Sequence, residues 1–167
     1  MSTRILGIDP GTRISGYGCV DLPDNAIEPT LIEGGTLTFK ATDSLDDRLR
    51  HLYEDLTELI QTLKPQRMAV EKLYAHYKHP RTAILMGHAR GVILLTARQA
   101  NIPIDHLPST EVKKSITGHG HASKEQIQQA IASQCNLPEP PSPPDVADAI
   151  AIAIVSARRL ATERLTR

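Results

Sequence analysis

The sequence predicts an α/β protein in which a mixed five-stranded sheet is flanked by helices. Two observations favour this class: short apolar runs alternate with longer amphipathic stretches, and the first three runs precede any helix. Successive strands suit an antiparallel meander, whereas strands separated by helices usually pair in parallel. A chain of 167 residues fits one domain with a core of its own. We therefore assign residues 1–160 to a single domain and 161–167 to a C-terminal tail.

The opening of the chain is predicted to form the meander. A short apolar run over residues 5–9 ends at Asp9, where a Pro-Gly pair signals a turn. Residues 15–20 indicate a strand that returns beside the first one. Residues 30–39 indicate a third strand, in which the pair Gly34-Gly35 suggests a bulge.

The next two elements are a helix and a strand. Ser44 is predicted to cap a helix whose apolar stripe continues to Leu63, and Pro65 ends it. Residues 67–71 then form a short apolar run that ends in Glu71. Because glutamate is depleted in strands, a glutamate in this position needs a partner or a function.

Residues 82–100 are predicted as a helix with a broad apolar surface. Its Gly87 and Gly91 would let another backbone approach closely, either the sheet of the same chain or a second subunit. The remaining elements are a parallel-type strand at 102–104, a short helix capped by Ser109, a loop at 118–121, a helix over 124–135 capped by Ser123, a proline-rich connection at 136–144, and a last helix from Asp145 to about Glu163.

The composition is that of an ordinary globular protein, with 40% apolar and 23% charged residues. No apolar run reaches the roughly 20 residues that cross a bilayer, and no signal-peptide pattern is present at the N-terminus. The two cysteines, Cys19 and Cys135, lack the spacing of metal ligands. We therefore expect a cytoplasmic protein.

Charge is distributed unevenly, although the net charge is zero. Residues 72–124 carry eight bases and two acids, and no acid lies between Lys72 and Ile104. Such asymmetry can mark a basic surface for phosphate backbones. The alternative is that these charges scatter around two helices and form no common surface.

Four acids stand out by position: Asp9 and Glu71 at strand ends, and Asp145 and Asp148 on one face of the last helix. Each group has a structural alternative, because Asp9 could hydrogen-bond its own turn and Asp145 could cap its helix. Four carboxylates that meet would repel and raise each other's pKa, which Mg²⁺ relieves. Two such ions about 3.5–4 Å apart can clamp the attacking and leaving oxygens of a phosphoryl group.

Seven motifs follow one another along the chain: Gly7-Ile8-Asp9-Pro10-Gly11-Thr12, Gly16-Tyr17-Gly18, Val70-Glu71, Gly87-x-Ala89-Arg90-Gly91-Val92, Val112-Lys113, Gly118-x-Gly120-x-Ala122-x-Lys124 and Asp145-x-Ala147-Asp148-Ala149-x-Ala151-x-Ala153. In this order they resemble the RuvC Holliday junction resolvases, over essentially the whole chain to about residue 158. Seven motifs in a shared order are far more specific than any one of them. The departures are modest: His119 and His121 in the glycine loop, and the long proline-rich run.

This resemblance implies an RNase H-like nuclease domain and a homodimeric endonuclease that nicks two symmetric strands of four-way DNA junctions in recombination and repair. It places Asp9, Glu71, Asp145 and Asp148 on the family's catalytic, metal-binding acids. Two Mg²⁺ ions per active site, with Mn²⁺ able to substitute, would then perform two-metal phosphodiester hydrolysis. The family's partners are the RuvA and RuvB branch-migration proteins.

The resemblance also implies residues that contact DNA. Lys113 and Lys124 fall on family lysines that approach the scissile phosphate, where they would offset charge in the transition state. Tyr74 falls on a family aromatic, commonly phenylalanine, that disturbs base stacking; its ring retains stacking worth about 1–3 kcal/mol per base. Further DNA contacts are expected from three more basic residues, Lys78, Arg81 and Lys114.

Three other functions share part of this pattern. The Asp-x-Gly-Thr turn also occurs in actin-like kinases, which need two such domains and hence a longer chain. A pre-16S-RNA-processing nuclease of the same fold has a similar opening, but the block from Gly118 to Lys124 favours the resolvase. A non-catalytic junction-binding protein would not need all four acids.

Overall fold

Within residues 1–74 and 78–166, which this computed structural model describes, the chain forms five strands and five helices. The strands are β1 (Ser2–Asp9), β2 (Ile14–Pro23), β3 (Thr30–Thr38), β4 (Arg67–Glu71) and β5 (Ile104–Leu107). The helices are α1 (Leu45–Leu63), α2 (Pro80–Gln99), α3 (Ser109–Thr117), α4 (Lys124–Gln134) and α5 (Pro144–Leu165). This succession of strands and helices is the predicted one.

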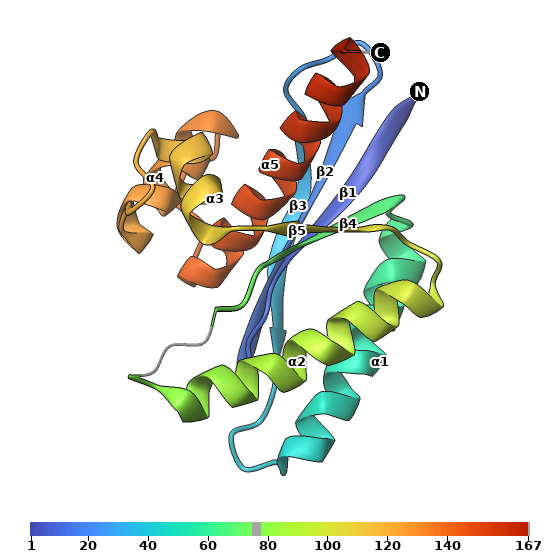
Figure 1. The fold of residues 1–167 in the computed structure, drawn as a ribbon, viewed down its shortest axis with the longest axis vertical. Helices are drawn as coiled ribbons and strands as arrows, with labels where there is room; N and C mark the ends of the chain where they lie inside the picture. The colour runs from blue at the N-terminus through green and yellow to red at the C-terminus, as the bar shows by residue number, and fades with distance from the viewer. Residues whose placement is uncertain (75–77, 167) are drawn as a thin grey trace.

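The strands form one mixed sheet in the order β3-β2-β1-β4-β5. β1, β2 and β3 pair antiparallel, whereas β4 pairs in parallel with both β1 and β5. Helices α3, α4 and α5 lie over one face, and α1 and α2 lie over the other (Figure 1). The meander and the parallel strands therefore agree with the prediction.

Each of the central strands contributes to two apolar cores, because side chains alternate between the faces of a sheet. Ile5 of β1 belongs to the core with α3, α4 and α5, whereas Leu6 belongs to the core with α1 and α2. Ala69 and Met68 of β4 divide in the same way. Strands buried on both faces appear as continuous apolar runs, which is why the sequence reveals them.

Helix α5 packs very closely on the sheet because glycines line its path. A Cβ on Gly7 would lie 2.3 Å from the carbonyl oxygen of Ala149, and one on Gly18 would lie 2.6 Å from the Cα of Ile150. Such distances are too short for any side chain, so the backbone of α5 rests directly on β1 and β2.

The predicted bulge in β3 is misplaced. The irregular pairing lies opposite Cys19 and Val20 and leaves Ile32 as the extra residue, whereas Gly34-Gly35 pairs regularly with β2. The glycines serve packing instead, since a Cβ on Gly35 would lie 2.8 Å from the hydroxyl of Tyr17.

The fifth strand spans Ile104–Leu107 and not 102–104 as predicted. Its Asp105 accepts hydrogen bonds from Arg67 at 2.8 and 2.9 Å, and a further one from Ser156 of α5. Because this strand contains a polar residue, which is bonded to Arg67 of β4 and to Ser156 of α5, a search for apolar runs does not detect it.

Helix ends agree with the sequence in most places. Ser44 and Ser123 accept capping hydrogen bonds as predicted, but Ser109 is the first residue of α3, and Pro108 stands at its cap position. Helix α5 continues to Leu165, past residue 160, and the division of the chain into a domain and a tail stays a prediction. In the described ranges, no helix combines the length and apolarity that a membrane crossing requires.

The glycines of α2 do not face the sheet. The nearest atom to a Cβ on Gly87 belongs to the Leu73 side chain at 3.7 Å, and among described residues nothing lies within 4 Å of a Cβ on Gly91. Of the two alternatives predicted for these glycines, close approach by the sheet of the same chain is therefore wrong. Ile84 and Leu95 are 62% and 55% exposed, so α2 keeps an apolar surface open to solvent.

Candidate active site

Asp9 and Glu71 end neighbouring strands on one face of the sheet. Ile8 pairs with Val70 in the parallel β1–β4 ladder, so the next residue of each strand is a carboxylate at the same edge. Because side chains alternate along a strand, both carboxylates belong to the face that α5 covers, as does Ala69.

Helix α5 brings the second pair of acids to this edge. Gly16 is the partner of Asp9 in the β1–β2 ladder, and a Cβ on it would lie 2.0 Å from the carbonyl oxygen of Asp145. The first turn of α5 therefore rests on the strand end itself. Asp148 follows one helical turn later and shares the face of Asp145, as the spacing predicts.

The structure shows neither of the two local roles considered for these acids, a hydrogen bond from Asp9 to its own turn and capping of α5 by Asp145. Pro143 occupies the cap position of α5, which has no side-chain capping hydrogen bond, so Asp145 is not a cap. Ser15 closes the turn after Asp9: its hydroxyl donates to the Gly11 carbonyl at 2.9 Å and accepts from the Gly11 amide at 3.0 Å. Neither carboxylate therefore makes the local hydrogen bond that the sequence alone allowed, although Asp145 remains in the first turn of α5, where an acid complements the helix dipole.

All four carboxylates line one cleft of about 680 Å³. Lys113 of α3 and Lys124 at the start of α4 line it as well, so the cleft brings together all six residues predicted to be catalytic. The polar and charged lining residues are Asp9, Thr12, Arg13, Glu71, Thr82, Ser109, Lys113, Lys124, Asp145 and Asp148.

Burial and mutual repulsion perturb these carboxylates. Burial, followed by the charges of Asp148, Glu71 and Asp145, raises the pKa of Asp9 well above its ordinary value, against the opposing effect of Lys124. Burial also raises the pKa of Asp148 to about 6, again opposed by the Lys124 ammonium. With protein groups alone around them, these carboxyls are drawn toward the neutral form.

The donor set suits a hard cation. None of the hydrogen bonds or ion pairs between described residues involves a carboxylate oxygen of the four acids. Within the same part of the chain, no three His, Cys, Asp or Glu side chains converge closely enough to hold a metal ion. Oxygen ligands with excess negative charge are what Mg²⁺ prefers. To bind metal, the side chains would have to rotate so that the repelling carboxylates share the cations.

Tyr74 lies beside the acidic cleft. Its side chain is 57% exposed, and it borders a smaller groove. Thr82 and Met86 line both the groove and the cleft, so the two are contiguous. The other residues of the groove are Leu73, His79 and Ala83.

The remaining bases differ in their surroundings. Lys78, Arg81 and Lys114 are exposed and do not line the cleft. Residues 76 and 77 of the predicted basic and aromatic loop lie outside the described residues. Arg13 is exposed and lines the cleft, and the sequence interpretation missed it because it precedes the basic stretch. Its position directly after the Pro-Gly-Thr turn is the signal that could have identified it.

Arg90, also in the basic stretch, has a structural role. Its Nε donates to the backbone carbonyl of Glu71 at 3.2 Å, and its Nη2 donates to Nδ1 of His106 at 2.6 Å. Burial, then the charges of Arg90 and Lys72, lowers the pKa of His106, which favours the neutral ring that can accept this bond. Arg90 thus ties the end of β4 to α2.

Comparison with known proteins identifies the family. Residues 5–156 match the family model described as crossover junction endodeoxyribonuclease RuvC. The chain belongs to the RuvC family. The RuvC of Rhodopirellula baltica is 46% identical over 150 residues, which cover 90% of this chain and 83% of that protein. The RuvC of Desulforamulus reducens is 44% identical over 154 residues, which cover 92% and 93%. Both relatives are named crossover junction endodeoxyribonucleases, so the predicted family and enzyme class are confirmed.

Solved structures support the same fold. Thermus thermophilus RuvC in complex with a Holliday junction substrate is 28% identical, with a TM-score of 0.86 and coverage of 97% of each chain. The yeast mitochondrial Holliday junction resolvase Ydc2 gives a TM-score of 0.66 at 16% identity, covering 98% of this chain and 80% of that one, and shows the fold alone. The predicted RNase H-like fold of this RuvC-family chain is therefore confirmed.

Proposed function

We propose that this chain is a Holliday junction resolvase whose four carboxylates perform two-metal hydrolysis of DNA. The observation that carries the proposal is the cleft itself: Asp9, Glu71, Asp145 and Asp148 share it with two lysines. RuvC-family nucleases generally depend on a metal ion. A relative of the same fold has been solved with a Holliday junction substrate, which supports a four-way junction as the substrate here.

The four acids would hold two Mg²⁺ ions, or Mn²⁺ in their place, which would supply an activated water and charge compensation for the departing 3′ oxygen. The acids themselves fix the coordination site, since strand ends and a helix packed on glycine leave their backbones little freedom. Lys113 and Lys124 place ammonium groups in the same cleft, where they stabilise the extra negative charge of the pentavalent transition state.

DNA would reach the acids along the exposed side of the cleft. Tyr74 offers an aromatic face beside it on which an unpaired base can stack. Lys78, Arg81 and Lys114 would contact phosphates farther along the arms of the junction, because they are exposed and outside the cleft. Arg13 joins this set as a phosphate contact at the cleft itself.

We further propose that two copies pair through α2, so that two active sites face a nearly two-fold junction and nick symmetric strands. Ile84, Gly87, Gly91 and Leu95 recur at helical spacing along α2 and form one stripe. Both large members of the stripe are exposed, and glycines let a partner helix approach. Ile84→Glu combined with Leu95→Glu should convert a dimer to a monomer in sedimentation, and an unchanged sedimentation coefficient would reject this face.

By family resemblance, the resolvase would act with the RuvA and RuvB branch-migration proteins in the cytoplasm. Pull-down of RuvA or RuvB bound to a junction tests this association. Recovery of neither protein on a junction that the chain itself binds would count against it.

The proposed activity is tested by incubating the chain with a labelled four-way junction and a matched duplex, with Mg²⁺ or with chelator. We expect paired, ligatable nicks in the junction alone, lost with chelator and in Asp9→Asn, while that variant still binds the junction. Binding without cutting under every metal and junction sequence would indicate a junction-binding protein. Cleavage of RNA instead would indicate a processing nuclease.

A further inference from the structure

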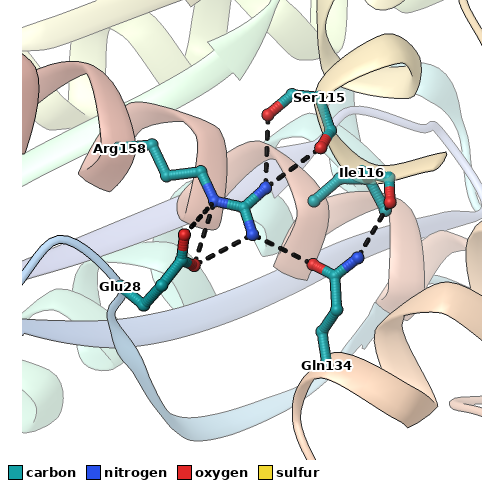
Figure 2. Close-up of polar contacts among 5 residues, drawn as sticks. All are labelled: Glu28, Ser115, Ile116, Gln134 and Arg158. Atoms are coloured by element: carbon teal, nitrogen blue, oxygen red, sulfur yellow. Dashed lines mark hydrogen bonds and ion pairs between the residues drawn. The ribbon is translucent and has the colours of Figure 1, made fainter. Parts of the chain in front are cut away.

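Arg158, in the C-terminal half of α5, joins four segments of the chain (Figure 2). Its Nε and Nη2 donate to the carboxylate of Glu28, in the β2–β3 connection, at 2.9 to 3.0 Å. Its Nη1 donates to the backbone carbonyl of Ser115 on α3 at 3.1 Å, and its Nη2 donates to Oε1 of Gln134 on α4 at 3.1 Å. A single guanidinium thus links α5 to both small helices.

These contacts provide hydrogen-bond donors for the backbone carbonyls at the C-terminal end of α3. The last carbonyls of a helix lack intrahelical partners, and a cation is favourable beside them. In α3, the carbonyl of Ser115 accepts from Arg158, and the carbonyl of Ile116 accepts from Nε2 of Gln134 at 2.8 Å. Gln134 presents its oxygen to Arg158 and its nitrogen to Ile116 (Figure 2), so the arginine also orients the amide that caps α3.

Both lysines of the cleft belong to the two helices that Arg158 holds. Lys113 lies two residues before Ser115, and α4 runs from Lys124 to Gln134. Apolar contacts hold the pair against α5, but such contacts have no preferred direction, whereas hydrogen bonds do. The apolar side chains that α3 and α4 bury are Val112, Ile116, Ile127 and Ile131.

We propose that Arg158 is a positioning residue that sets α3 and α4, and with them Lys113 and Lys124, in place relative to the acids on α5. This inference rests on the function proposed above for the two lysines. Arg158 itself acts from the far half of α5, since ten residues of helix, about 15 Å, separate it from Asp148.

Arg164 on the same helix provides a matched control. Its side chain is 28% exposed, against 24% for Arg158. Its Nη2 donates to Oγ1 of Thr3 at 2.6 Å and lies 3.5 Å from a carboxylate oxygen of Asp24. These contacts reach β1 and the β2–β3 connection but neither α3 nor α4. Arg164→Met therefore removes a comparable arginine without releasing the helix pair.

The experiment compares Arg158→Met and Arg164→Met in the full chain by junction cleavage, hydrogen exchange and thermal unfolding. We expect Arg158→Met to lower kcat by about tenfold to a hundredfold, because a misplacement of about 1 Å can cost that much, with KM little changed. Amides of α3 and α4 should exchange faster in this variant alone. In a background of Lys113→Ala and Lys124→Ala, Arg158→Met should cause little further loss, because residues that act as a unit are not additive.

Unchanged exchange of α3 and α4 in Arg158→Met would overturn the positioning role, whatever the activity. Equal losses of kcat in the two methionine variants would also overturn it, as would a full additional loss in the lysine background. If the lysine variants cleave as well as the wild-type chain, the proposed function of the lysines fails. The exchange measurement still decides whether Arg158 fixes the helix pair.

Discussion

Two regions border the acidic cleft, one formed by β1, β2 and α5 and the other by α2 with the neighbouring Tyr74, and they are packed differently. On the first wall, a Cβ on Gly16 would lie 2.0 Å from the carbonyl oxygen of Asp145. On the second, no described atom lies within 4 Å of a Cβ on Gly91, and Ile84 and Tyr74 remain 62% and 57% exposed. We refer to these as the closed wall and the open wall.

The difference fits the functions that we propose for the two walls. Carboxylates that repel one another keep a fixed geometry only if the backbone segments that carry them cannot move apart. The close packing of α5 on the glycines of β1 and β2 prevents such movement. A surface that receives DNA or a second copy keeps its apolar and aromatic groups accessible until the partner binds. Substitutions on the two walls should therefore have different consequences.

Asp148→Asn on the closed wall should reduce the cleavage rate by about three orders of magnitude, which corresponds to about 4 kcal/mol of transition-state stabilisation. The amide keeps the shape of the side chain but loses the charge that a cation needs. Single-turnover cleavage of a junction with saturating Mg²⁺ measures the effect. Arg81→Ala on the open wall is the control and should weaken binding without changing that rate; a variant at Asp148 that cleaves at the wild-type rate would refute the division.

Gly16→Ala and Gly91→Ala should have opposite effects on stability. The first forces a methyl group into the backbone of α5 and should destabilise the fold by about 1–3 kcal/mol or more. The second, made in the Ile84→Glu and Leu95→Glu background so that no partner helix covers α2, adds helix propensity at an open site and should be neutral or stabilising by up to about 1 kcal/mol. Urea denaturation measures both free energies of unfolding. Equal destabilisation by the two substitutions would show that the walls do not differ.

Tyr74→Ala should weaken junction binding by about 1–3 kcal/mol, the usual value of one stacked base. Tyr74→Phe should bind like the wild-type chain, because the ring and not the hydroxyl makes the contact. Titration of a fluorescent junction in chelator separates binding from cleavage. If Phe and Ala are equally weak, the hydroxyl carries the interaction and stacking does not.

The smallest effect concerns the Arg4–Asp21 pair, which joins β1 to β2 at 2.8 Å. Hydrogen bonds from Arg4 lower the pKa of Asp21, so the pair stabilises the fold above the ordinary aspartate pKa and loses this effect as pH falls through the folded value. Asp21→Asn should therefore destabilise at neutral pH by about 1 kcal/mol or less, since the pair is partly solvated.

Urea denaturation of the wild-type chain and Asp21→Asn as a function of pH checks the sign. The two unfolding free energies should converge in acid, below the folded pKa of Asp21. A difference that grows as pH falls would contradict the assignment.

Much of the site could be predicted from the sequence because it depends on strand ends. Apolar runs buried on both faces of a sheet are recognisable, and a carboxylate after each run predicts where Asp9 and Glu71 lie. Whether Asp145 caps its helix could not be decided in advance. It depends on the helix beginning one residue earlier, with Pro143 at the cap position, and boundaries at this level are set by packing.

Other features carry no local signal. β5 contains Asp105, whose charge is acceptable in a strand only because Arg67 and Ser156 bind it. Arg158 makes contacts with residues 24 to 130 positions away in the sequence, which neither periodicity nor composition indicates. The sequence also does not reveal which face of α2 is exposed to solvent, because this depends on where the other helices and strands pack.

Thermal unfolding of the wild-type chain and of Asp9→Asn, with and without Mn²⁺, tests most directly whether the four carboxylates form a shared cation site. Without the ion, Asp9→Asn should unfold at the higher temperature, because burial and the charges of Asp148, Glu71 and Asp145 oppose ionisation of Asp9, a cost that an amide avoids. With Mn²⁺, the wild-type chain should gain stability, since the ion binds the folded state, and Asp9→Asn should gain much less. Equal responses of the two proteins to Mn²⁺ would contradict a shared cation site.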